Sequence, residues 1–83
     1  MATREQISKT ILDIIRTIAP EADLANIDPA DRFRNQFDFD SVDFMNLAAA
    51  LQTTLQVNIP EEDYPHLATL KGCIAYLTSK VNT

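Results

Sequence analysis

The only serine with a chemically suggestive setting is Ser41, which lies among three carboxylates in the run DFDSVD of residues 38–43. Catalysis by its hydroxyl would need a neighbouring base, and the only histidine of the chain is His66. No Gly-x-Ser-x-Gly turn surrounds Ser41, and three acids would oppose a developing negative charge. We therefore expect no catalytic residue in this chain.

A serine at the start of a helix is better suited to being modified. There it is exposed, and the free backbone amides of the first turn can receive a phosphate oxygen. The other interpretation is that Ser41 simply caps the helix, and residue chemistry alone leaves both open. A calcium site at Asp38, Asp40 and Asp43 is disfavoured, because the glycine and distant glutamate of a calcium loop are absent. With a single cysteine, Cys73, no Cys-based metal site forms either, so we expect no metal.

A helix over residues 3–18 precedes this site. Its apolar residues follow the spacing of one helix face, and they are Ile7, Ile11, Ile14, Ile15 and Ile18. Thr3 and Gln6 form a predicted capping box, and Pro20 is a predicted stop. Residues 20–40 show no helical period, so we expect a long loop that Phe33 and Phe37 anchor to the core.

The site itself opens a second helix, from residues 40–41 to about 56. Asp40 can cap it, and Asp43 favours the positive end of its dipole. One apolar face comprises Phe44, Leu47, Ala48, Leu51 and Leu55. A separate stripe of Val42, Met45 and Ala49 is predicted to face outward.

The remaining segments are a short helical turn at residues 60–64, ended by Pro65, and a last helix that Thr69 caps. Its apolar positions are Leu70, Ile74, Leu77 and Val81, and Cys73 beside them is interpreted as a core residue. The prediction is an all-α four-helix bundle, with three long helices and one short one, and a long loop between helices 1 and 2. The whole chain, residues 1–83, is expected to be a single domain.

Composition limits the partners. The net charge of −5 disfavours nucleic acid. Composition alone leaves open whether this acidity attracts proteins with basic surfaces or only keeps a small domain soluble. No apolar run has the length of a signal peptide or a membrane span, so we expect a cytoplasmic protein without a membrane span.

The run of residues 40–43, followed by Leu47 and Leu51, resembles the Asp-Ser-Leu motif of acyl and peptidyl carrier proteins. The resemblance covers nearly the whole chain. Phe33 is similar to the loop phenylalanine that precedes the motif, and NIPEED at residues 58–63 is similar to the turn before the short third helix. Residues 69–70 and 76–77 are similar to the last helix of the family.

This resemblance implies a carrier that holds acyl groups as thioesters on a 4'-phosphopantetheine arm. A separate phosphopantetheinyl transferase would attach the arm from coenzyme A to Ser41, which Asp40 flanks in the motif. The resemblance also implies partner docking, by residues Val42, Asp43, Met45 and Ala49. The acyl-pocket candidates that it implies, for which plain core packing is the alternative, are Ala48, Leu51 and Ile59.

The sequence departs from the family pattern in three ways. Val42 replaces the usual leucine, Asp38 stands where many carriers have glycine, and Asn46, Gln52 and Thr53 replace acids on the outer face of the helix. We therefore expect a specialised carrier in fatty acid, lipid or polyketide biosynthesis. It would act as a monomer and dock on acyl-transferring or synthase enzymes with basic or apolar surfaces. The alternatives are a peptidyl carrier protein and an unmodified protein–protein interaction module with the carrier fold.

Overall fold

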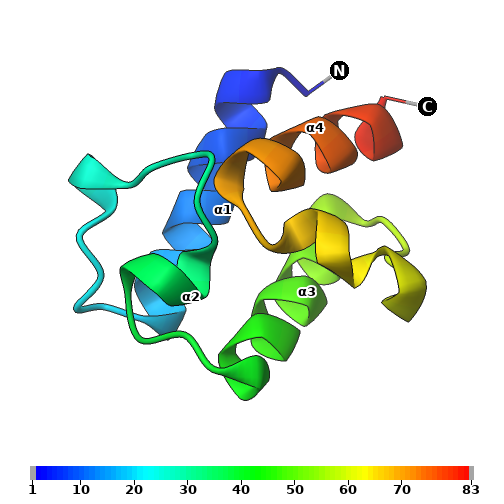
Figure 1. Ribbon diagram of the computed structural model, residues 1–83. Coiled ribbons are helices and arrows are strands. Elements are labelled where there is room, and N and C mark those ends of the chain that lie inside the picture. The colour runs from blue at the N-terminus through cyan, green and yellow to red at the C-terminus, as the bar shows by residue number, and fades with distance from the viewer. Residues whose placement is uncertain (1, 83) are drawn as a thin grey trace.

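Three long helices and one shorter one form the body of the protein. The computed structural model describes residues 2–82. Its long helices are α1 (Arg4–Ile18), α3 (Ser41–Leu55) and α4 (Leu70–Val81), and the shorter one is the 3-10 helix η2 (Glu61–Leu67) (Figure 1). Within the described residues no strand forms, and an isolated bridge joins Arg32 to Thr69. The all-α four-helix prediction is confirmed.

The start of each long helix is capped as the sequence predicts. The Thr3 hydroxyl accepts from the Gln6 N–H at 3.1 Å, and the Gln6 side chain accepts from the Thr3 N–H at 2.9 Å. At α4, the Thr69 hydroxyl accepts from the Gly72 N–H at 2.9 Å. These bonds satisfy backbone donors that have no partner inside the helix, so they define where each helix begins.

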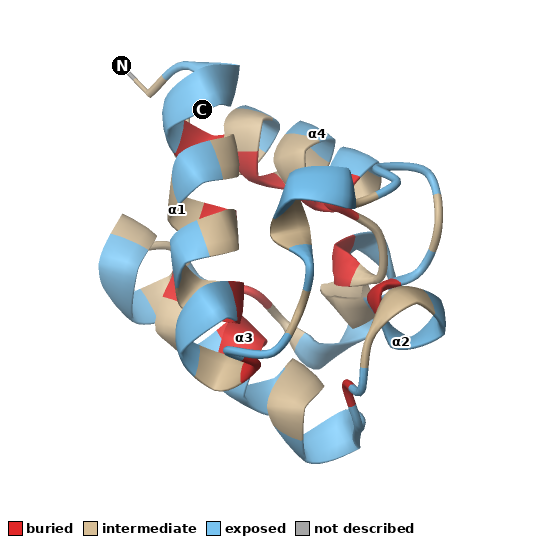
Figure 2. Ribbon diagram, turned by 90° about the vertical axis from the view of Figure 1, so that its left-hand side faces the viewer, coloured by how far each residue is buried: buried red, intermediate tan, exposed pale blue. Residues whose placement is uncertain are grey.

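The core lies between α1, α3 and α4, whose inner sides carry buried residues (Figure 2). α1 packs against both α3 and α4, and η2 packs against α4. The largest fully buried side chains are Phe33, Ile7, Ile11, Ile15, Leu47, Leu51, Leu67, Leu77 and Cys73. Cys73 is thus a core residue, as predicted, and burial raises the pKa of its thiol to about 12.

The long loop between α1 and α3 is held down by three phenylalanines. Phe33 is buried, and its ring centroid lies 6.0 Å from that of Phe37 and 5.9 Å from that of Phe39. The backbone N–H of Phe33 also donates to the Ala68 carbonyl at 3.0 Å. The predicted anchoring by Phe33 and Phe37 is confirmed.

Two short helical turns in this loop, η1 (Leu24–Asn26) and α2 (Phe33–Gln36), were not predicted. They are too short to show a helical period, so sequence spacing does not reveal them. α2 matters for the site, because it determines where Arg32 and Arg34 lie on either side of the buried Phe33.

The prediction that Pro65 ends the short helix is wrong, since η2 continues to Leu67. The fixed φ of proline suits a 3-10 helix, and its missing N–H removes only one hydrogen bond. Gly72, the only glycine, lets η2 approach α4 closely, because a Cβ there would lie 2.8 Å from the His66 carbonyl oxygen. The two ends of the chain lie at the same end of the molecule (Figure 1), where the Asn82 side chain donates to the Ala2 carbonyl at 3.0 Å.

Among residues 2–82, no helix combines the length and the apolar character that a membrane span requires.

Candidate functional site

Ser41 is the first residue of α3, and Asp40, not Ser41, caps the helix. The Asp40 carboxylate accepts from the Asp43 N–H at 2.8 Å, and the Asp43 carboxylate accepts from the Asp40 N–H at 3.3 Å. The interpretation of Ser41 as the cap is therefore wrong, while the predicted cap at Asp40 is confirmed. Ser41 is exposed, and its hydroxyl forms no hydrogen bond within residues 2–82. Its oxygen is available for modification.

His66 takes part in a different cluster. Its ring stacks on Tyr76 at a centroid distance of 5.3 Å and an interplanar angle of 7°. The Tyr76 hydroxyl donates to the Asp63 carboxylate at 2.6 Å. Partial burial, together with this hydrogen bond and the charge of Asp63, raises the pKa of Tyr76 to about 12. This cluster joins η2 to α4, and no hydrogen bond in the described chain pairs His66 with Ser41.

Next to Ser41 lies a hollow of about 500 Å³. Its walls come from the long loop, the start of α3 and the junction between η2 and α4. The residues that line it are Arg32, Phe33, Arg34, Phe39, Asp40, Ser41, Phe44, Pro65, Ala68 and Thr69. Sequence reasoning did not place Arg32 and Arg34 at this site. The one available signal was the DRFRN run at residues 31–35, in which two arginines flank an anchoring phenylalanine.

The predicted outward stripe is exposed. Val42 and Met45 are 62% and 60% exposed, and Ala49 is exposed as well. Asp43 is half-buried, and its carboxylate already accepts a hydrogen bond from the Asp40 N–H in the capping box. The placement of the stripe is as predicted, and its role in docking stays a prediction.

The acyl-pocket candidates Ala48, Leu51 and Ile59 lie in the closed core, with exposed fractions of 0%, 0% and 3%. None of the three lines the hollow at Ser41. In the observed conformation they therefore pack as ordinary core residues. Phe44 and Tyr64 form an edge-to-face pair with ring centroids 6.0 Å apart, which connects α3 to η2.

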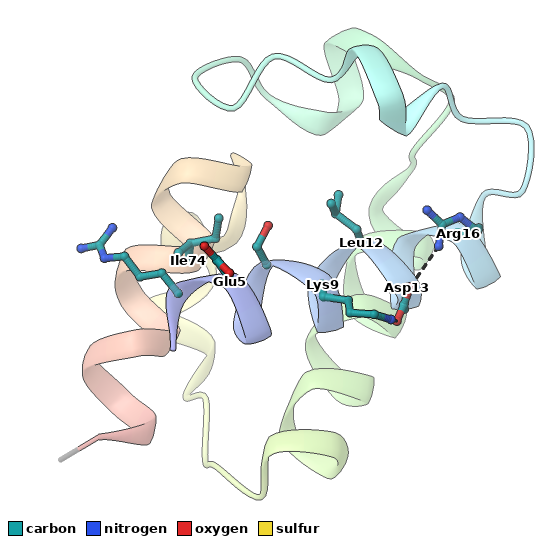
Figure 3. A pocket seen from close by; sticks show the side chains of 8 residues that line it. Glu5, Lys9, Leu12, Asp13, Arg16 and Ile74 are labelled. Carbon is teal, nitrogen blue, oxygen red and sulfur yellow. Dashed lines mark hydrogen bonds and ion pairs between the residues drawn. The ribbon is translucent and has the colours of Figure 1, made fainter. Parts of the chain in front are cut away.

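A second hollow lies along α1 and differs in its electrostatics. Two of its three basic residues, Lys9 and Arg16, both contact Asp13, each at 2.9 Å (Figure 3). Hydrogen bonding to Lys9 lowers the pKa of the Asp13 carboxyl, with a smaller contribution from Arg16. No group of three or more His, Cys, Asp or Glu side chains in the described chain is arranged to hold a metal ion.

An exposed serine at the start of a helix, whose hydroxyl does not cap that helix, is typical of a phosphopantetheine carrier when it occurs in an acidic bundle of this size. The family model described as "Phosphopantetheine attachment site" matches residues 9–77. An acyl carrier protein from Lactobacillus johnsonii is 32% identical over 96% of this chain and 99% of its own length. One from Helicobacter hepaticus is 27% identical over 93% of this chain and 95% of its own length.

The chain therefore belongs to the phosphopantetheine-attachment family, and within it to the acyl carrier proteins. Its cofactor is a covalently attached 4'-phosphopantetheine, and its role is to carry acyl groups in biosynthesis. Members of this family are carriers rather than catalysts. The predicted family, fold and carrier function are confirmed.

Proposed function

We propose that Ser41 is the residue that carries the phosphopantetheine arm, and that residues 1–83 form one carrier domain. The observation that supports this most directly is the state of the Ser41 hydroxyl. It is exposed at the first position of α3, it is not used for capping, and it lies at the edge of a hollow. The sequence contains two other serines, Ser8 in α1 and Ser79 in α4, and neither begins a helix.

Modification requires a separate phosphopantetheinyl transferase and coenzyme A. The Ser41 oxygen forms a bond to phosphorus while the phosphoanhydride bond of coenzyme A breaks. Adenosine 3',5'-bisphosphate leaves, and the serine proton passes to the transferase. When bound, the arm supplies a terminal thiol that holds acyl groups as thioesters. The carrier contributes the position of the hydroxyl, which the Asp40–Asp43 capping box fixes by fixing the start of α3.

Docking on the transferase and on acyl-transferring or synthase enzymes is assigned to the exposed stripe of Val42, Met45 and Ala49. Asp43 is the only acid on α3, so the helix offers little charge to a basic partner. Additional acidic contacts would come from Glu61 and Glu62, which are exposed at the start of η2. Asp63 is less available, because it already accepts from Tyr76. Apolar contact would therefore contribute more to docking here than charge does.

The buried residues Ala48, Leu51 and Ile59 would line an internal acyl pocket only in a conformation in which α3 and η2 move apart. In the closed bundle they are buried in the hydrophobic core. We further propose that the domain acts as a monomer in the cytoplasm. A relative from Schizosaccharomyces pombe, 24% identical over 90% of this chain, is named as mitochondrial, so localisation by cell fractionation is an informative test.

The attachment site is tested by intact mass after incubation with coenzyme A and a broad-specificity phosphopantetheinyl transferase. The wild-type protein should gain the mass of one phosphopantetheine group. Ser41→Ala should gain nothing, and the matched control Ser8→Ala should gain as much as wild type. A mass gain that survives Ser41→Ala would contradict the assignment of this residue. No gain in any variant would favour the unmodified interaction module.

A further inference from the structure

Two arginines line the Ser41 hollow without an ion pair. The chain carries twelve acids, yet neither Arg32 nor Arg34 forms a salt bridge within residues 2–82, and both side chains are exposed. Among the other bases, Lys9 and Arg16 on α1 share Asp13, and Lys80 lies over the Tyr76 ring at 5.6 Å, whereas Arg4 and Lys71 form no salt bridge within residues 2–82 either. The hollow beside the attachment residue thus presents two arginines without an ion pair, together with the Asp40 carboxylate, which is held in the capping box.

The anion that arrives next to them is the phosphodiester of the arm. Ser41 is preceded by Asp40 and followed closely by Asp43, whose carboxylates are held in the capping box. A phosphodiester on Ser41 adds a further negative charge beside these two acids, and the neighbouring like charges repel it. The guanidinium groups attract it, and their planar fork matches two phosphate oxygens.

The floor of the hollow suits the rest of the arm. Phe39 is buried, Phe44 is half-buried, and Pro65 and Ala68 add apolar surface from η2 and the residue after it. The volume of about 500 Å³ lies within the range of small-molecule sites, roughly 300–1,000 Å³. A flexible, partly apolar chain that starts at Ser41 can therefore bury part of its length here.

We propose that Arg32 and Arg34 bind the phosphodiester of the arm and lay the arm into this hollow when no partner enzyme is docked. The inference rests on the proposed attachment at Ser41. It assigns the resting arm to a surface hollow, separate from the closed core around Ala48, Leu51 and Ile59. When a partner enzyme docks, the phosphodiester would leave the two arginines, and the arm would then enter the active site of that enzyme.

Two measurements on the holo protein test this inference, one at the phosphate and one at the far end of the arm. The phosphate is observed directly by its ³¹P resonance. The arm is labelled at its terminal thiol with a maleimide nitroxide. The label broadens the NMR signals of nearby backbone amides, and this broadening is measured. The label reacts with the arm alone, because Cys73 is the only cysteine, is buried, and has a thiol pKa raised to about 12.

The informative variant is Arg32→Gln/Arg34→Gln. Its matched control is Arg4→Gln/Lys9→Gln, which removes the same charge from the α1 hollow (Figure 3). In wild type and control, the label should broaden the amides of Phe39 and Ala68 and spare Gln6. In the informative variant this broadening should fall about fivefold, as expected for two lost exposed charge contacts, and the ³¹P resonance should shift.

Three outcomes would overturn the inference. One is equal broadening in wild type and the informative variant, and another is no broadening of the hollow in wild type. The third is an effect of the arginine substitutions on the ³¹P resonance that appears only when the unlabelled arm carries a succinyl thioester, since the arginines would then bind a cargo carboxylate. Failure of the proposed function is distinguishable, because it would appear earlier, as the absence of a mass gain at Ser41.

Discussion

Leu47, Ala48 and Leu51 on the inward face of α3 are fully buried, whereas Val42 and Met45 on its outward face are more than half exposed. The two faces use similar side chains on one helix. They differ in their surroundings, because α1 packs on the inward face and no element covers Val42 and Met45. An apolar residue on the inward face therefore stabilises the fold, while one on the outward face is available to a partner.

The largest expected effect is on folding stability. Leu47→Ala should lower the free energy of unfolding by about 2–5 kcal/mol, because it removes a buried side chain and leaves a cavity. Met45→Ala, two residues away on the outward face, should change it by no more than about 0.5 kcal/mol. Urea denaturation followed by circular dichroism measures both. Equal losses in the two variants would break the contrast between the faces.

The next effect concerns docking. Val42→Ala/Met45→Ala should lower kcat/KM for modification by the transferase about tenfold, or about 1.4 kcal/mol, because it removes exposed apolar contacts. Asn46→Ala/Thr54→Ala, a double variant at other exposed positions of α3, is the control and should leave kcat/KM nearly unchanged. If the two double variants behaved alike, the outward stripe would not be the docking surface.

A smaller effect on folding stability distinguishes the capping residue Asp40 from the attachment residue Ser41. Asp40→Ala should cost about 1 kcal/mol of folding stability, because the Asp43 N–H loses its acceptor. Ser41→Ala should leave stability within about 0.5 kcal/mol of wild type, since its hydroxyl makes no hydrogen bond in residues 2–82. Thermal and urea unfolding of the two variants provide the comparison. A loss confined to Ser41→Ala would return the capping role to the serine.

Local signals in the sequence predict much of the fold. The capping pairs Thr3–Gln6 and Asp40–Asp43 lie three residues apart, and they form as predicted because each needs only one turn of helix. The apolar periods of α1, α3 and α4 are equally local. The extent of η2 was harder to predict, since Pro65 is a helix breaker in an α-helix and is tolerated in a 3-10 helix.

By itself, the sequence determined that this protein is an acidic helical carrier with Ser41 at the start of a helix, because helix periods, caps and the motif are properties of neighbouring residues. Only the tertiary structure decided which groups meet at that serine. Arg32 and Arg34 reach the hollow because Phe33 between them is buried and its N–H is bonded to Ala68. That contact joins segments far apart in the chain, and no local pattern encodes it.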